Sequence, residues 1–221
     1  MKQDHTGGPA PPPAFTQPAV HRLPPAPLSV LDPAATARLD ALIDLLLRWN
    51  SRINLVADRD PAAIRSRHIA DSLQLLPLLP AGAGPFADLG SGGGFPGLVL
   101  AIAGPRPAHL VESDRRKAAF LTDAAARLGL RHVQVHARRI EDANLPPLAA
   151  VTARALAPLR ALLPDAARLL APGGVAIFPK GRAAEAELTE ALPHWTLIAE
   201  RFASRTDPEA TIFRLSDIRA R

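Results

Sequence analysis

The chain has 221 residues, 48% of them hydrophobic, so it is long enough to bury a full core in one domain with additions. It contains no cysteine, which excludes disulfide scaffolds, cysteine-ligated zinc sites and thiolate nucleophiles and fits a reducing cytoplasm. A formal net charge of +5 permits a polyanionic partner without requiring one. We expect a cytoplasmic protein with no metal site and no membrane partner, because the N-terminus lacks a signal-peptide core and charges interrupt the longest apolar run.

The N-terminal region differs in composition from the rest. Residues 1–27 carry eight of the 24 prolines and few large apolar groups, a composition that predicts a flexible tail. Apolar residues at helical spacing then follow Asp32-Pro33 as far as Trp49, and Asp60-Pro61 opens a second predicted helix. We therefore expect residues 28–80 to be a helical extension packed on a core formed by residues 81–221.

A glycine-rich loop follows the first apolar strand of this core. Four glycines occupy the five positions 90–94, so a ligand must approach the backbone closely, and we expect a nucleotide-like cofactor. The spacing Gly92-x-Gly94-x-x-Gly97 formally matches the dinucleotide fingerprint, which leaves an NAD(P)-dependent oxidoreductase as an alternative. Asp88 at the strand end would repel a pyrophosphate, but it can accept a hydrogen bond from a cationic or amine-bearing ligand.

The remainder of the core alternates strands with helices. This alternation between residues 85 and 181 predicts a parallel sheet, and two strands without an intervening helix then predict an antiparallel closing pair. Glu112 ends the second strand, where its carboxylate can accept both hydroxyls of a ribose. After the glycine loop we expect strands at 109–112, 132–136, 149–153, 175–178, 195–202 and 211–215, and helices starting at Asp114 and covering 158–170 and 183–192.

Several short segments resemble known families. Asp88 to Gly97 is similar to the first motif of class I S-adenosylmethionine methyltransferases. The order and spacing of the segments over about residues 39 to 215 resemble the RsmG (GidB) family. They are Trp49-Asn50-x-x-Ile53-Asn54-Leu55, Arg67-His68-Ile69-Ala70-Asp71-Ser72-Leu73, the glycine loop with Phe95-Pro96-Gly97, Leu110-Val111-Glu112-Ser113, Arg139-Ile140-Glu141, Ala153-Arg154-Ala155 and Lys180-Gly181.

The resemblance implies a fold and a reaction. The fold is the α/β, Rossmann-like class I S-adenosylmethionine-dependent methyltransferase fold, with a mostly parallel sheet, an antiparallel C-terminal strand pair and N-terminal helices. The reaction is methylation of N7 of a guanine in bacterial 16S rRNA, with S-adenosyl-L-methionine as cofactor. The partner is naked 16S ribosomal RNA or a small ribosomal subunit particle. A non-catalytic RNA-binding module is a second alternative, although the few aromatic residues offer little stacking surface. The oligomeric state stays open, with a monomer expected.

The resemblance also implies roles for single residues. Gly90 and Phe95 would line the cofactor, Glu112 would hold its ribose, Ile140 and Glu141 would frame the adenine, and Arg154 would lie at the methionine end. Asp88 and Gly92 complete the expected cofactor-binding set. Each acid has the alternative of a plain surface or strand-end carboxylate.

Basic residues near these segments are candidates for RNA contact. Three of them begin one helix, where their positive charge is unfavourable with the helix dipole. An external partner such as a phosphate would explain their position. Solvated helix-start charges and a buried structural histidine at position 68 are the alternatives. The candidates are His68, Arg115, Arg116, Lys117, Arg139 and Lys180. No catalytic base is assigned, because guanine N7 carries a lone pair and no proton.

Overall fold

The computed structural model describes residues 19–23 and 31–221. Within these ranges no helix is long and apolar enough to cross a membrane. The elements in chain order are β1 (Val20–Arg22), α1 (Pro33–Asn50), α2 (Pro61–Ile64), the π-helical turn η2 (Arg65–Ile69), α3 (Ala70–Leu73), the 3-10 turn η3 (Leu76–Leu78), β2 (Phe86–Leu89), α4 (Gly97–Ala103), β3 (Ala108–Val111), α5 (Arg115–Arg127), β4 (Val133–His136), β5 (Leu148–Thr152), α6 (Leu159–Leu169), β6 (Leu170–Lys180), α7 (Ala184–Ala191), β7 (Trp195–Ala203) and β8 (Thr211–Ala220).

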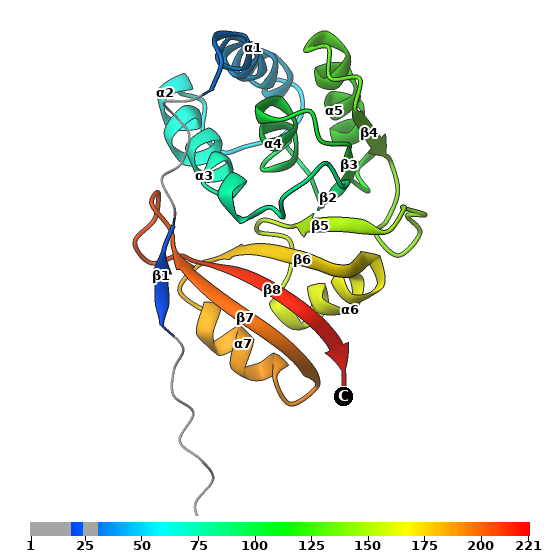
Figure 1. Cartoon of the computed structure of the whole chain (residues 1–221). Coiled ribbons are helices and arrows are strands. Elements are labelled where there is room, and N and C mark those ends of the chain that lie inside the picture. The colour runs from blue at the N-terminus through cyan, green and yellow to red at the C-terminus, as the bar shows by residue number, and fades with distance from the viewer. Residues whose placement is uncertain (1–18, 24–30) are drawn as a thin grey trace, which may run out of the picture.

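One eight-stranded sheet forms the middle layer, in the order β1-β7-β8-β6-β5-β2-β3-β4. Strands β6, β5, β2, β3 and β4 are parallel to one another, whereas β8 runs antiparallel to both β6 and β7. Helices α1 to α5 lie on one side of the sheet, and α6 and α7 lie on the other (Figure 1). The predicted parallel sheet with an antiparallel closing pair is therefore confirmed.

The predicted flexible tail is wrong at one place. Val20–Arg22 forms an edge strand parallel to β7, and Leu23 is buried in a cluster that contains Phe202. An edge strand offers unpaired backbone groups, so even a short segment can add to it when one apolar side chain anchors it. Residues 1–18 and 24–27 of the predicted tail lie outside the described residues.

The two predicted N-terminal helices are present, and their caps explain where they start. Asp32 accepts a hydrogen bond from the amide of Ala35 at 2.6 Å, and Asp60 accepts one from Ala63 at 3.0 Å. The second helix is continuous from α2 through η2 to α3. Its wide π-helical turn contains His68, and such turns occur frequently at functional sites.

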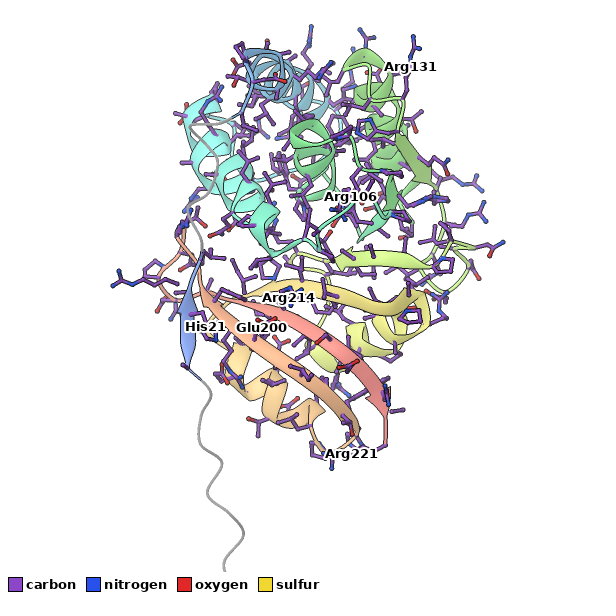
Figure 2. The ribbon with its side chains drawn as sticks, in the orientation of Figure 1. His21, Arg106, Arg131, Glu200, Arg214 and Arg221 are labelled. Atoms are coloured by element: carbon purple, nitrogen blue, oxygen red, sulfur yellow. The ribbon has the colours of Figure 1, made fainter. Side chains whose placement is uncertain are left out.

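Two arginines, both labelled in Figure 2, hold residues 78–84 at the end of this helical region. Arg214 of β8 forms an ion pair with Glu200 of β7 and donates to the carbonyl oxygen of Leu78, at 3.1 Å. Arg106, in the loop before β3, donates to three carbonyl oxygens of the segment that enters β2. These belong to Pro80, Gly82 and Gly84, at 2.7, 2.5 and 3.2 Å. The helical region is packed on the sheet, while its boundary with the core at residue 80 stays a prediction.

Candidate active site

The glycine loop leaves β2 in a conformation that demands glycine. Gly90, Gly92 and Gly94 have φ of +68°, +52° and +86°, in the left-handed region that disfavours other residues. A Cβ atom on Gly90 would lie 2.5 Å from Cδ1 of Leu156, so the loop also needs a small residue to pack against the segment after β5. Both constraints place bare backbone at the carboxyl end of the sheet.

Most amides of this loop are bonded within the protein. Gly92 donates to the Glu112 carboxylate at 2.8 Å, and Gly97 donates to the Asp88 carboxylate at 3.1 Å. Two further loop amides donate to the carbonyl oxygen of Val111. A dinucleotide-binding loop instead needs free amides to receive a pyrophosphate. The loop therefore argues against an NAD(P)-dependent oxidoreductase, despite its glycine spacing.

Asp88 is a buried structural carboxylate. It is 1% exposed, and its Oδ1 accepts from the Thr152 hydroxyl at 2.8 Å while Oδ2 accepts from Gly97. Burial raises its pKa to about 6, against the opposing effect of these hydrogen bonds. Asp88 joins β2 to β5 and to the start of α4. It does not line the pocket described next, and its bonds shape the loop, while its contact with a cofactor stays a prediction.

A pocket of about 370 Å³ opens over the glycine loop, and we call it the glycine-loop pocket. It brings together six of the eight predicted cofactor residues and two of the predicted RNA candidates. Phe95, like Asp88, lies outside it and is 5% exposed. The lining residues are Gly90, Gly92, Val111, Glu112, Ser113, Lys117, Arg138, Arg139, Ile140, Glu141, Arg154, Ala155 and Leu156.

Glu112 is the fixed polar group of this pocket. Its two carboxylate oxygens accept from the amides of Gly92 and Asp114, each at 2.8 Å, and the residue is 8% exposed. Each oxygen keeps a further lone pair, which a ligand hydroxyl can use. The half-buried Ile140 supplies apolar surface, and Glu141 stands exposed beside it. A carboxylate, an apolar wall and close-lying backbone suit a nucleoside without phosphates.

Arg154 closes one side of the pocket and is held by the N-terminal helical region. Its guanidinium donates to Asp71 at 3.2 Å and to Nδ1 of His68 at 3.0 Å. It also lies over the ring of Phe95, 5.4 Å from the centroid. These contacts leave the arginine little freedom to move, so the helical region positions a residue of the segment after β5.

The geometry fixes the protonation of His68. A guanidinium can only donate, so Nδ1 of His68 is the acceptor, and Nε2 carries the proton that it donates to Asp58 at 3.1 Å. Burial, followed by the charge of Arg154, lowers the pKa of His68 although Asp58 opposes this. His68 is therefore neutral at pH 7, and it stacks on Phe95 with ring centroids 5.0 Å apart. These contacts favour the structural alternative for His68 over RNA contact.

A second, larger pocket of about 800 Å³ adjoins the first, and we call it the large pocket. Arg154, Ala155 and Leu156 line both pockets. The loop between β7 and β8 also lines this pocket through Thr206, Asp207, Pro208 and Ala210. This loop reaches toward α3 (Figure 1). Asp71 of α3 connects this loop to Arg154. It forms an ion pair with Arg154 and accepts a hydrogen bond from the Thr206 hydroxyl of the loop at 2.7 Å.

The remaining RNA candidates differ in whether their charge is used within the protein or exposed to solvent. Lys180 lines the large pocket, but it forms an ion pair with Glu187 at 2.9 Å and donates to the carbonyl oxygen of Ala157 at 2.5 Å. Its charge is therefore used within the protein. Arg115 and Arg116 are exposed at the start of α5, and their contact with RNA stays a prediction.

Sequence reasoning missed several residues of the site. Asp71 belongs to the segment Arg67 to Leu73, but its hydrogen-bond partners Arg154 and Thr206 lie far away in the chain. Leu156 and Arg138 adjoin predicted site residues, so inspection of those neighbours could have found them. Thr206 and Asp207 lie in a loop that the resemblance does not mark, and no local pattern indicated them.

The sheet order, the glycine loop and the strand-end carboxylate beside it define a class I methyltransferase fold. A solved O-methyltransferase from Bacillus cereus, in complex with SAH, superimposes with a TM-score of 0.55. It covers 85% of this chain and 93% of its own, at 17% identity, and this likeness concerns the fold alone.

Sequence comparison gives the family. The model of the GidB family, rRNA small subunit methyltransferase G, matches residues 35–205. The ribosomal RNA small subunit methyltransferase G of Acidiphilium cryptum is 59% identical over 184 residues, 82% of this chain and 84% of its own. That of Rhodospirillum centenum is 55% identical, over 83% and 85%. The chain belongs to the rRNA small subunit methyltransferase G family and is a methyltransferase, which confirms the resemblance.

Proposed function

We propose that this protein transfers a methyl group from S-adenosyl-L-methionine to N7 of a guanine in 16S ribosomal RNA. Family membership supports the reaction class. The observation that carries the proposal is the common wall of the two pockets at residues 154–156. A methyl group can pass directly from a ligand in one pocket to a base in the other only where the pockets meet.

The glycine-loop pocket suits the cofactor. Glu112 would accept the ribose hydroxyls, Ile140 and Glu141 would frame the adenine, and Arg154 would lie at the methionine end. When bound, the cofactor supplies an electrophilic methyl carbon, and the electron pair of its carbon–sulfur bond stays on sulfur as the methyl group leaves. Most amides of the glycine loop are bonded internally, which agrees with a cofactor that has no phosphate.

The large pocket suits an unstacked base. RNA is read mainly where bases can be splayed out of a helix, and its volume is within the range of small-molecule sites. The task of the protein is to hold guanine N7 toward the shared wall. Since N7 has a lone pair and no proton, no side chain has to remove one, and positioning supplies the catalysis.

Exposed arginines around the glycine-loop pocket suit the RNA backbone. Arg138 and Arg139 lie at the rim of the pocket, and Arg115 and Arg116 begin the neighbouring helix. Positive charges at such a rim attract phosphates without reading sequence. The proposed substrate is 16S RNA, free or within the small subunit, bound by a monomer in the cytoplasm.

The test is the identity of the product. Purified protein is incubated with methyl-labelled cofactor and either 16S RNA or small subunits, and the digested nucleosides are identified by mass spectrometry. The proposal predicts labelled 7-methylguanosine from at least one of the two substrates. Label at another atom, or none in either substrate, would contradict it. Calorimetry with NAD, which should not bind, tests the oxidoreductase alternative.

A further inference from the structure

Leu156 is an apolar side chain in an unusual position. In the described part of the chain, the large hydrophobic residues that are exposed are Val20, Leu156 and Ile198. Leu156 is 40% exposed, and of these residues it is the one that lines both pockets. An exposed leucine alone needs no explanation, but one on the wall between two adjoining pockets does.

The backbone beside Leu156 is strained. Ala155 has φ of +51°, in the left-handed region that is unfavourable for a residue with a Cβ atom. Such strain persists where the surroundings impose it, and it is concentrated at functional sites. Here the turn separates two neighbours with different roles. Arg154 contacts His68 and Asp71, whereas Leu156 contacts the glycine loop.

The glycine loop fixes where Leu156 lies. A Cβ atom on Gly90 would be 2.5 Å from Cδ1 and 3.1 Å from Cδ2 of Leu156. The leucine therefore occupies the space that the glycine leaves free, which restricts its rotamers. Its remaining exposed surface lines the two pockets, next to the place where the methyl group must cross.

The chemistry of a base matches this surface. A purine has two flat apolar faces, and these are stabilised when a side chain removes them from water. Leu156 is the largest apolar side chain that lines the large pocket, since the other apolar lining residues are alanines and prolines. The charged lining residues are Arg67, Asp71, Arg154, Lys180, Glu187 and Asp207. The chain has no tyrosine, and Phe95 is buried beneath Arg154.

We propose that Leu156 is the surface on which one face of the target guanine packs, and that it positions the base for methyl transfer. The inference rests on the proposed function and adds a residue that determines how the substrate is held. Arg154 would then fix the polar side of the shared wall, and Leu156 its apolar side.

The test compares Leu156→Ala and Leu156→Met with the control Ile198→Ala, which truncates an exposed apolar side chain on β7 outside both pockets. Steady-state methylation gives kcat/KM for RNA, and calorimetry gives the affinity for S-adenosylhomocysteine. Leu156→Ala should lower kcat/KM about tenfold, because part of a leucine contact is lost. Leu156→Met should stay within about threefold of wild type, because it keeps apolar volume. Cofactor affinity should change less than about twofold in both.

Two results would overturn the inference. If Leu156→Ala behaves like Ile198→Ala, the leucine is a plain exposed residue. If S-adenosylhomocysteine affinity falls as much as kcat/KM, Leu156 serves the cofactor and not the base. Failure of the proposed function is seen separately, since the wild-type protein would then form no 7-methylguanosine at all.

Discussion

The two pockets are built in different ways. The glycine-loop pocket takes most of its lining from the carboxyl ends of three consecutive parallel strands, β2, β3 and β4. The large pocket collects segments from the N-terminal helical region, the end of β6 and the β7–β8 loop. The first pocket therefore follows from the sheet topology itself, as ligand sites in open α/β sheets do. The second also depends on the N-terminal helical region and on the β7–β8 loop, so these two segments should decide which substrate is methylated.

The pockets are nevertheless connected through one short segment. Arg154 lines both and is held by Asp71 and His68 of the helical region. A substitution in the large pocket can therefore alter cofactor binding through Arg154, and a substitution in the glycine-loop pocket can alter substrate binding in the same way. Substitutions on either side, and at the connection, can separate the two regions experimentally.

The largest effect is expected at the connection. Arg154→Ala should lower the single-turnover rate about 100-fold or more, because a misplaced methyl donor or base loses the alignment that positioning supplies. The loss should come mainly through cofactor affinity and geometry. Arg219→Ala, an exposed arginine near the end of β8, is the control and should be neutral. A loss at Arg154 below about tenfold would show that the connection is dispensable.

Glu112→Ala should act on the glycine-loop pocket alone. It removes charge-assisted hydrogen bonds to the ribose, and S-adenosylhomocysteine binding should weaken by about 1.5 to 3 kcal/mol. RNA binding without cofactor should stay as in wild type. Because Glu112 also accepts two backbone amides, thermal unfolding is measured in parallel. Unchanged cofactor affinity in a folded variant would contradict the ribose role.

Asp71→Asn should act chiefly on the large pocket. Asp71 connects Arg154 to Thr206 of the β7–β8 loop, and the amide keeps one acceptor but loses the charge. We expect kcat/KM for RNA to fall about tenfold, a change of ~1.4 kcal/mol, with a smaller change in cofactor affinity. The opposite order of effects would assign Asp71 to the cofactor and remove the distinction between the pockets.

Replacing Arg115 and Arg116 together by alanine should have a smaller and less specific effect. If they contact phosphates, RNA binding weakens similarly for target and non-target sequences, and the slope of log K against log salt falls by about 2. Affinities measured over a series of salt concentrations give that slope. A slope equal to that of wild type would mean that the two arginines are a solvated helix start.

Most of the glycine-loop pocket could be predicted from the sequence. Its residues follow apolar strands whose ends are marked by local signals, such as the N-terminal cap Asp114 and the left-handed Gly90 and Gly92. The internal hydrogen bonds of Asp88 could not be predicted, because the spacing of residues does not tell whether a strand-end carboxylate is bonded within the protein.

Most of the large pocket could not be predicted from local sequence patterns. Its contacts join residues distant in the chain, such as Asp71 and Thr206, and no periodicity encodes such a pair. Ala155 adopts a left-handed conformation that its residue type does not indicate. The edge strand Val20–Arg22 was missed for a similar reason, since three residues in a proline-rich segment become a strand only beside β7.

The central claim is that the protein positions guanine N7 and abstracts no proton. The ring of His68 contacts Arg154 of the shared wall at 3.0 Å, and burial lowers the pKa of this histidine, which favours its neutral form. Single-turnover methyl transfer with saturating RNA and cofactor tests the claim most directly. The account predicts a rate that is nearly flat from about pH 6.5 to 8.5, and equally flat in His68→Ala even if slower. A log-linear rise of unit slope that one substitution abolishes would show proton abstraction and contradict attack by N7.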